Sequence, residues 1–247
     1  MPKETRMPYL SIVIPAYNEA KRIAASLDKI ADYLSAQKYT YEALVVDDGS
    51  TDGTAEVCRA IASSHPWLEV LRYPVNRGKG HAVRAGVLAV GGEHVLICDA
   101  DLATPIEELD GFWRFFEEGA DIVIASRPLR ESHLVKRQPL YREFAGRVFN
   151  LLVRAVAVRG IHDTQCGFKL FRGEAARAIF PLCSLNDFGF DIEVLHVAQR
   201  IGFRIREAPV HWHHRPGSKV RLLRDGLRML LDLFRIRLRH RDLPRRA

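Results

Sequence analysis

The sequence predicts an α/β fold: a mostly parallel sheet flanked by helices, with an amphipathic helix at the C-terminal end. From residue 9 to residue 126, short β-rich apolar runs alternate with helical patterns, which is the order of βαβ units. The chain has 247 residues, of which 47% are hydrophobic, and this is enough for one large core. No apolar run reaches the roughly 18 residues that a transmembrane helix needs.

The individual strands and helices are predicted from apolar runs and from the residues that typically begin or end such elements. Strands are expected at 9–17, 41–50, 67–73, 93–99 and 120–126. Helices are expected from Asn18 to about residue 37, from Thr51 or Asp52 to about 64, after the turn 76–80 to 90, and from Pro105 to 118. Beyond Arg127 the alternation stops, and we expect a helix at 139–158, a short strand at 166–172, a helix at 190–201, a strand at 203–210 and a long helix from 218 to about 239.

Positive charge is concentrated at the C-terminal end. The net charge is +7, but residues 215–247 hold eleven of the 37 basic side chains and three of the 30 acidic ones. This tail therefore carries +8, and the rest of the chain is nearly neutral. We expect two parts: a main domain over 1–217 and a basic amphipathic helix over 218–247.

The sequence gives no support for several common classes of protein and site. The four cysteines, Cys58, Cys98, Cys166 and Cys183, are scattered, which predicts reduced thiols in a cytoplasmic protein rather than a zinc site or a disulfide framework. The first residues lack the apolar core of a signal peptide. No GxGxxG follows the first strand and no GxxxxGK[ST] occurs, which argues against a dinucleotide site and a P-loop.

Polar side chains follow the predicted strands, where ligands bind in parallel α/β sheets. These residues are Asn18 and Glu19, Asp47 and Asp48, Asp99 and Asp101, and Ser126 and Arg127. The pair Asp99 and Asp101 is the most informative, because alternate residues of extended backbone point to the same side. Two such carboxylates repel each other unless a cation lies between them, and Mg²⁺ commonly takes one or two protein carboxylates. The alternative is a pair of solvated acids.

Histidines and one tryptophan near the end of the domain allow other interpretations. His211, His213 and His214 lie close together and could form a metal site, but Asp99 and Asp101 already supply one, so we expect a loop near the substrate. Trp212 could stack on a sugar or face a membrane.

Six segments occur in the order and spacing of a known enzyme family: "IVIPAYNEA", "LVVDDGSTDGT", "NRGKGHAVRAG", "DAD", "ASR" and "DTQCGFKLF". The chain resembles the family 2 glycosyltransferases of the GT-A fold, and within them the dolichyl- and polyprenyl-phosphate glycosyltransferases. "DTQCGFKLF", "FDIEVL" and "PGSKV" resemble the dolichyl-phosphate β-glucosyltransferases more than the dolichyl-phosphate mannose synthases. The resemblance covers nearly all of residues 9–225.

The resemblance implies a role for each matching position. Residues for the nucleotide sugar would be Pro15, Tyr17, Glu19, Asp47 or Asp48, Lys79, Asp99, Ala100 and Asp101. Asp99 and Asp101 would hold Mg²⁺ or Mn²⁺ on the donor diphosphate. Residues for phosphate, of the acceptor or of the donor, would be Arg127, Arg142 and Lys219. Asp163 and Asp191 are the acids expected to orient the acceptor or the sugar, or else to act as helix caps or salt-bridge partners.

The implied reaction is an inverting, metal-dependent transfer of a hexose, glucose from UDP-glucose, to a polyprenyl or dolichyl phosphate. A phosphate monoester has a second pKa of about 6, so it is a nucleophile at neutral pH and a general base is optional. Alternatives are GDP-mannose as donor or a soluble acceptor. Nucleic-acid binding through the basic tail is a remote alternative and is not expected, since no recognition motif accompanies the arginines. A homo-oligomer is left open.

A membrane surface is the expected partner of the tail. An apolar stripe of the predicted helix comprises Val220, Leu223, Leu227, Leu230, Leu231, Phe234 and Leu238. Arginines lie largely elsewhere on it, at Arg221, Arg224, Arg228, Arg235 and Arg239. Basic amphipathic helices bind membrane surfaces, and the apolar segment 148–158 could add a second interfacial element. We therefore expect a cytoplasmic protein, peripheral on the inner face of the cell membrane; an ordinary packed helix is the alternative.

Overall fold

A seven-stranded sheet forms the centre of the molecule. The computed structural model describes residues 7–136, 151–154, 156–213 and 222–244. The strands of the sheet are β1 (Leu10–Ala16), β2 (Tyr41–Asp48), β3 (Leu68–Tyr73), β4 (His94–Ile97), β5 (Ile122–Ala125), β7 (Lys169–Arg172) and β8 (Ile205–Ala208). Their order is β3-β2-β1-β4-β7-β5-β8. A separate two-stranded sheet joins β6 (His133–Lys136) and β9 (His211–His213).

Strand β7 is the antiparallel member of the large sheet. It pairs antiparallel with both β4 and β5, while all other pairs in this sheet are parallel. The parallel strands therefore all end at one edge. At that edge β7 begins, so the segment before Lys169 joins the loops that follow β1, β2, β4 and β5.

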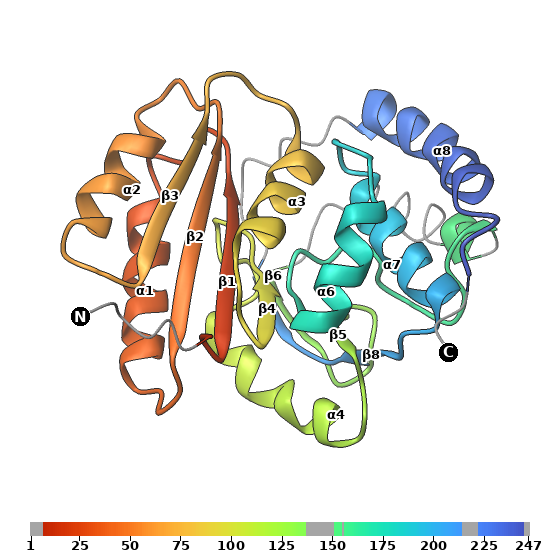
Figure 1. Ribbon diagram of the computed structural model, residues 1–247, viewed down its shortest axis with the longest axis horizontal. Helices are drawn as coiled ribbons and strands as arrows, with labels where there is room; N and C mark the ends of the chain where they lie inside the picture. The colour runs from red at the N-terminus through yellow and green to blue at the C-terminus, as the bar shows by residue number, and fades with distance from the viewer. Residues whose placement is uncertain (1–6, 137–150, 155, 214–221, 245–247) are drawn as a thin grey trace.

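Helices cover both faces of the sheet (Figure 1). They are α1 (Ile23–Ser35), α2 (Thr54–Ala62), α3 (Lys79–Ala89), α4 (Trp113–Glu117), α6 (Gly173–Ile179), α7 (Phe190–Ile201) and α8 (Leu222–Arg239), with short 3-10 helices η1 (Ile106–Gly111) and η2 (Phe180–Leu182). Alternate residues of β1 show the two layers: Ile12 and Ile14 pack with α1, and Val13 packs with α3. At Gly86 of α3 a Cβ would lie 2.4 Å from Val13 Cγ1, so glycine permits this close approach.

Most of the predicted elements are confirmed. The five strands of the first half, the strand after Cys166 and the helix Phe190–Ile201 lie where the apolar patterns indicate. Some expectations are wrong in detail. Asn18 does not cap α1, which begins at Ile23; it has φ +51° and its Oδ1 accepts a hydrogen bond from the Thr51 amide at 2.9 Å. The helix expected at 105–118 is η1 followed by the short α4.

The C-terminal helix α8 packs on the domain through one face and exposes another. Met229, Leu233 and Ile236 are buried in the same core as α7. Leu231, Phe234 and Leu238 are between 53% and 68% exposed. In the described part of the chain no helix is both long and apolar enough to span a membrane.

Candidate active site

Asp99 and Asp101 lie in a turn at the end of β4, rather than in extended backbone as expected. The Leu102 amide donates to the Asp99 carbonyl at 3.0 Å, and the Ala103 amide donates to Asp101 Oδ1 at 3.1 Å. Leu102, with φ +45°, completes the turn. Burial, and after it the Asp99 carboxylate, raise the pKa of Asp101. The turn thus places the two carboxylates close enough for the charge of Asp99 to raise the pKa of Asp101.

Gly167 makes room for Asp99. A Cβ at this position would lie 1.9 Å from Asp99 Oδ2, so the carboxylate occupies the space that any other residue would fill. Among the described residues no group of three or more His, Cys, Asp or Glu side chains could hold a metal ion. Two carboxylates nevertheless match Mg²⁺, which fills the rest of its shell with water and phosphate oxygens. The donor set therefore fits a hard divalent cation.

Two cationic side chains approach the aspartate pair. Lys79 Nζ lies 2.6 Å from Asp99 Oδ1. Arg22 Nη1 lies 3.9 Å from Asp101 Oδ2 and also pairs with Glu19. Burial alone would lower the pKa of Lys79, but the carboxylates of Asp99 and Asp191 raise it above its usual value. The ammonium group of Lys79 is accordingly charged.

Asp48 holds the loop that carries Lys79. Its Oδ1 accepts from the Arg77 amide at 2.9 Å, and its Oδ2 accepts from the Gly78 amide at 2.8 Å. Asp47 is fully buried, with Oδ1 accepting from the Ser50 amide and Oδ2 lying 3.3 Å from Arg72 Nε. Both acids thus hold the loops after the strand ends in place.

The loops after β1 and β2 are joined by hydrogen bonds. The Glu19 amide donates to Thr54 Oγ1 at 2.8 Å, and the Asn18 amide donates to Ser50 Oγ at 2.8 Å. Pro15 is buried within β1 and Tyr17 follows it, half-buried. The loops that carry the residues expected at the nucleotide thus lie at the same end of the parallel strands as Lys79 and the aspartate pair.

Arg127, two residues after the end of β5, forms a bidentate ion pair with Asp163. Arg127 Nε and Nη2 lie 2.6 and 2.8 Å from the two Asp163 oxygens, and the Arg127 amide donates to Oδ2 at 3.1 Å. Burial would raise the pKa of Asp163, but Arg127 holds it below its ordinary value. The guanidinium carbon lies 5.4 Å from the centre of the Trp212 ring. Trp212 is 8% exposed, so it supports Arg127 rather than offering an open face to a membrane.

Asp191 is the partner of a buried lysine. Lys169 Nζ lies 2.5 Å from Asp191 Oδ1 and donates to the Cys166 carbonyl at 2.5 Å. Burial raises the pKa of Asp191, against the effect of Lys169. Asp191 is thus in a salt bridge with Lys169, and its expected role in orienting the acceptor or the sugar stays a prediction.

Two of the three histidines, His211 and His213, lie in the described strand β9 and contact neighbouring segments. His211 Nδ1 lies 2.7 Å from Glu108 Oε1, and its ring stacks on His133 with ring centres 5.0 Å apart. The His213 amide donates to the Ala103 carbonyl at 2.8 Å. The segment therefore runs beside the turn of the aspartate pair, as a strand rather than the expected loop.

Some expected residues lie outside the described part of the chain, and some residues that position the candidate site escaped the sequence analysis. Arg142, Lys219 and His214 belong to the first group. Residues missed are Arg22, Gly167, Lys169, Glu207 and Glu193. A lysine inside the apolar run "CGFKLF" was the available signal for Lys169, since a buried lysine requires a partner.

Glu207 is the clearest of these missed residues. It accepts from Ser126 Oγ at 2.6 Å, from the Asp163 amide at 3.0 Å and from His162. By binding both segments it fixes Asp163 opposite Arg127. No nearby sequence motif marks it.

Comparison with known proteins places this geometry in a family. The model of the glycosyl transferase family 2 matches residues 11–180. The chain belongs to this family. The glycosyltransferase is 36% identical over 244 residues to a dolichyl-phosphate beta-glucosyltransferase of Dictyostelium discoideum, covering 94% of this chain and 75% of that protein. It is 40% identical over 239 residues to such an enzyme of Trichomonas vaginalis, covering 92% and 70%.

Solved structures agree with the GT-A fold of this glycosyltransferase. Mannosyl-3-phosphoglycerate synthase from Rubrobacter xylanophilus has a TM-score of 0.68 at 24% identity, covering 94% of this chain and 74% of that one. Glucosyl-3-phosphoglycerate synthase from Mycobacterium tuberculosis, in complex with Mn²⁺, UDP and phosphoglyceric acid, has a TM-score of 0.65 at 25% identity, covering 96% and 80%. The expected fold class is therefore confirmed.

Proposed function

We propose that this glycosyltransferase moves glucose from UDP-glucose to a dolichyl or polyprenyl phosphate, with inversion at the sugar carbon. The observation that carries the proposal is the turn after β4, where Asp99 and Asp101 share one site and Gly167 leaves room for the first carboxylate. Relatives named dolichyl-phosphate beta-glucosyltransferase support the choice of donor and acceptor.

The donor end is assigned to the strand ends before Arg127. Asp99 and Asp101 would hold Mg²⁺ or Mn²⁺, and the bound cation would supply positive charge to the departing diphosphate. Pro15, Tyr17, Glu19, Ala100 and the acids Asp47 and Asp48 are proposed to form the wall around the nucleotide. Charge develops on the diphosphate as the sugar leaves, so cationic groups placed there stabilise the transition state more than the ground state.

The acceptor end is assigned to Arg127 and its surroundings. The Asp163 carboxylate pairs with one edge of the Arg127 guanidinium group, and the Trp212 ring lies against its face. These two contacts fix the plane of the guanidinium group. A fixed guanidinium suits a phosphate, which takes paired N–H donors. Arg142 and Lys219 are proposed as further phosphate ligands. The acceptor phosphate is already ionised at neutral pH, so a general base is optional.

Membrane association is proposed for α8 and the neighbouring segment 151–154. Leu231, Phe234 and Leu238 are exposed on α8, as are Leu151 and Leu152. Arg237 Nη1 donates to the Val156 carbonyl at 3.1 Å, which ties the two segments together. Exposed apolar side chains among arginines suit an anionic bilayer surface. We assign the protein to the cytoplasmic, inner face of the membrane, where its acceptor would lie, with 1–217 as the catalytic domain and 218–247 as the anchoring part.

A donor and acceptor panel tests the proposal. Transfer of radiolabelled sugar is measured with UDP-glucose and GDP-mannose, each with dolichyl phosphate or phosphoglyceric acid, in Mg²⁺ and in Mn²⁺. The expected product is a β-linked glucosyl phosphate lipid, identified by its anomeric NMR coupling. Efficient mannosyl transfer, without response to UDP-glucose, contradicts the donor. Transfer only to phosphoglyceric acid contradicts the lipid acceptor.

A further inference from the structure

Lys79 lies where an incoming divalent cation would compete with it. Its ammonium nitrogen is 2.6 Å from Asp99 Oδ1, the carboxylate that occupies the space beside Gly167. Asp191 already has Lys169 at 2.5 Å, and Arg22 lies 3.9 Å from Asp101. Asp99 is therefore paired with a cationic group that the protein itself supplies, the ammonium group of Lys79.

The backbone at Lys79 is held by contacts on both sides. The contact between Lys79 and Asp99 therefore starts from a fixed backbone position. Asp48 binds the two amides before it. On the opposite side a Cβ at Gly78 would lie 2.3 Å from the Asn186 carbonyl oxygen, and one at Gly80 would lie 2.4 Å from that of Leu185. The His81 amide also donates to the Asn186 carbonyl at 3.2 Å.

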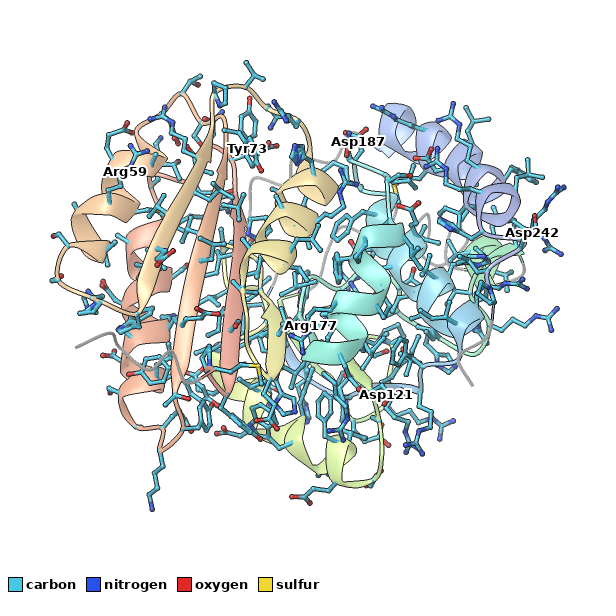
Figure 2. The ribbon with its side chains drawn as sticks, in the orientation of Figure 1. Arg59, Tyr73, Asp121, Arg177, Asp187 and Asp242 are labelled. Carbon is cyan, nitrogen blue, oxygen red and sulfur yellow. The ribbon has the colours of Figure 1, made fainter. Side chains whose placement is uncertain are left out.

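The loop that packs against Gly78 and Gly80 is itself fixed to the C-terminal helix. Arg228 Nη2 on α8 lies 2.7 Å from Asp187 Oδ2. Figure 2 shows Asp187 between the first turn of α3 and α8. The backbone that carries Lys79 is thus held by contacts on both sides, so we expect the ammonium group to leave Asp99 by rotation of the lysine side chain.

We propose that Lys79 is the resident counter-ion of Asp99, and that a divalent cation binds well only together with the donor diphosphate, which accepts the displaced ammonium group. The inference rests on the proposed metal site. A dication placed against Asp99 next to the ammonium would suffer like-charge repulsion. A diphosphate removes this repulsion, because it can bind the metal and the ammonium at once. Metal and nucleotide binding are then coupled, and the coupling is reciprocal.

Mn²⁺ binding provides a direct test without turnover. Free Mn²⁺ is measured by electron paramagnetic resonance, with and without UDP, after correction for Mn²⁺ bound to UDP alone. In the unmodified enzyme, UDP should tighten Mn²⁺ binding on the order of tenfold or more. Lys79→Met and Lys79→Gln should bind Mn²⁺ alone on the order of tenfold more tightly than the unmodified enzyme, and UDP should then help less.

Arg77→Gln is the matched control, because it removes one positive charge from the same loop. The Arg77 side chain contacts His81 and the Tyr73 ring rather than Asp99, so this variant should behave as the unmodified enzyme. If both Lys79 variants bind Mn²⁺ alone no more tightly than the unmodified enzyme, the counter-ion role is wrong. Asp101→Asn tests the proposed metal site separately from the counter-ion role of Lys79. If this variant binds Mn²⁺ in the presence of UDP as tightly as the unmodified enzyme does, the metal site is wrong, and the inference is wrong with it.

Discussion

Asp99 and Asp101 differ in their surroundings although one residue separates them. Asp99 has the ammonium group of Lys79 at 2.6 Å, whereas the nearest guanidinium nitrogen to Asp101 is Arg22 Nη1 at 3.9 Å. Asp101 is thus held in a site where its charge is poorly compensated. A buried carboxylate without a close positive partner lowers the free energy of unfolding. Its presence here favours a role in binding a cation.

Asp101→Asn should abolish most transfer and leave the fold intact. The substitution removes a charge that repels Asp99, so the melting temperature should stay equal or rise. kcat/KM should fall by at least about 100-fold, the usual loss when one group that stabilises transition-state charge is removed. Steady-state kinetics with circular dichroism melting checks both parts. Metal-dependent turnover near the unmodified rate would contradict the assignment of the pair.

Gly167→Ala should disable the site by steric means alone. The new Cβ meets Asp99 Oδ2, so the carboxylate must turn away, and kcat/KM should fall by about 10- to 100-fold, as for residues that orient metal ligands. Gly91→Ala is the control, since a Cβ there meets nothing within 4 Å. Equal kinetics for the two variants would show that the space beside Asp99 has no functional importance.

The Arg127–Asp163 pair should make stability depend on acid pH. Because Arg127 holds the folded-state pKa of Asp163 below its ordinary value, the stabilisation is present above the unfolded-state pKa of about 3.9 and is lost as pH falls through the folded-state value. Asp163→Asn should cost about 3 kcal/mol at pH 7, since it leaves a guanidinium group without its partner. Melting temperatures from pH 7 to pH 3 should fall less steeply in Asp163→Asn; parallel curves would contradict this role.

At the level of elements, α8 combines two functions on two faces. Met229, Leu233 and Ile236 join the core with α7, so deleting the helix would expose that core as well as remove the proposed membrane contact. Point substitutions on the exposed face separate the two functions.

Phe234→Ser with Leu238→Ser should weaken binding to anionic liposomes by at least about tenfold, because each buried large apolar side chain contributes about 1.5–3 kcal/mol. The melting temperature should be unchanged, since both side chains are more than 60% exposed. Leu88→Ser, at a 52% exposed site on α3, is the matched control. Liposome sedimentation makes the measurement, and equal sedimentation of both variants would mean that α8 only packs.

Local patterns predict elements better than they predict pairing. The strands ending in Ala16, Asp48 and Ile97 and the helix Phe190–Ile201 follow from apolar periodicity. The antiparallel insertion of β7 does not, because strand partners are chosen by tertiary contacts. Candidate site residues at strand ends were predictable from position, whereas Glu207 and Lys169 act through partners 44 and 22 residues away in sequence, which no local motif records.

Across the whole molecule, Glu193 connects the C-terminal helix to the loop beside Lys79. This fully buried carboxylate on α7 accepts from the amides of Ser184 and Leu185 at 2.8 and 2.7 Å, and it lies 3.0 Å from His240 Nε2. The loop that it fixes is the one that packs against Gly78 and Gly80.

Glu193→Gln should therefore act at a distance. Removing the charge weakens charge-assisted hydrogen bonds in a buried place, so the free energy of unfolding should fall by about 1–3 kcal/mol. UDP binding measured by calorimetry should weaken as the loop beside Lys79 loosens. Glu69→Gln, at an exposed site on β3, is the control. Loss of stability with unchanged UDP affinity would restrict Glu193 to a structural role.

The antiparallel strand β7 also dictates an order of assembly. Strand β5 meets the rest of the large sheet through β7, and β8 joins through β5. During synthesis, β1 to β4 can pair as soon as they leave the ribosome, while β5 waits until residues 169–172 have been made. The half of the molecule that is proposed to bind the nucleotide can therefore form first, and Asp99 meets Gly167 only when β7 joins the sheet.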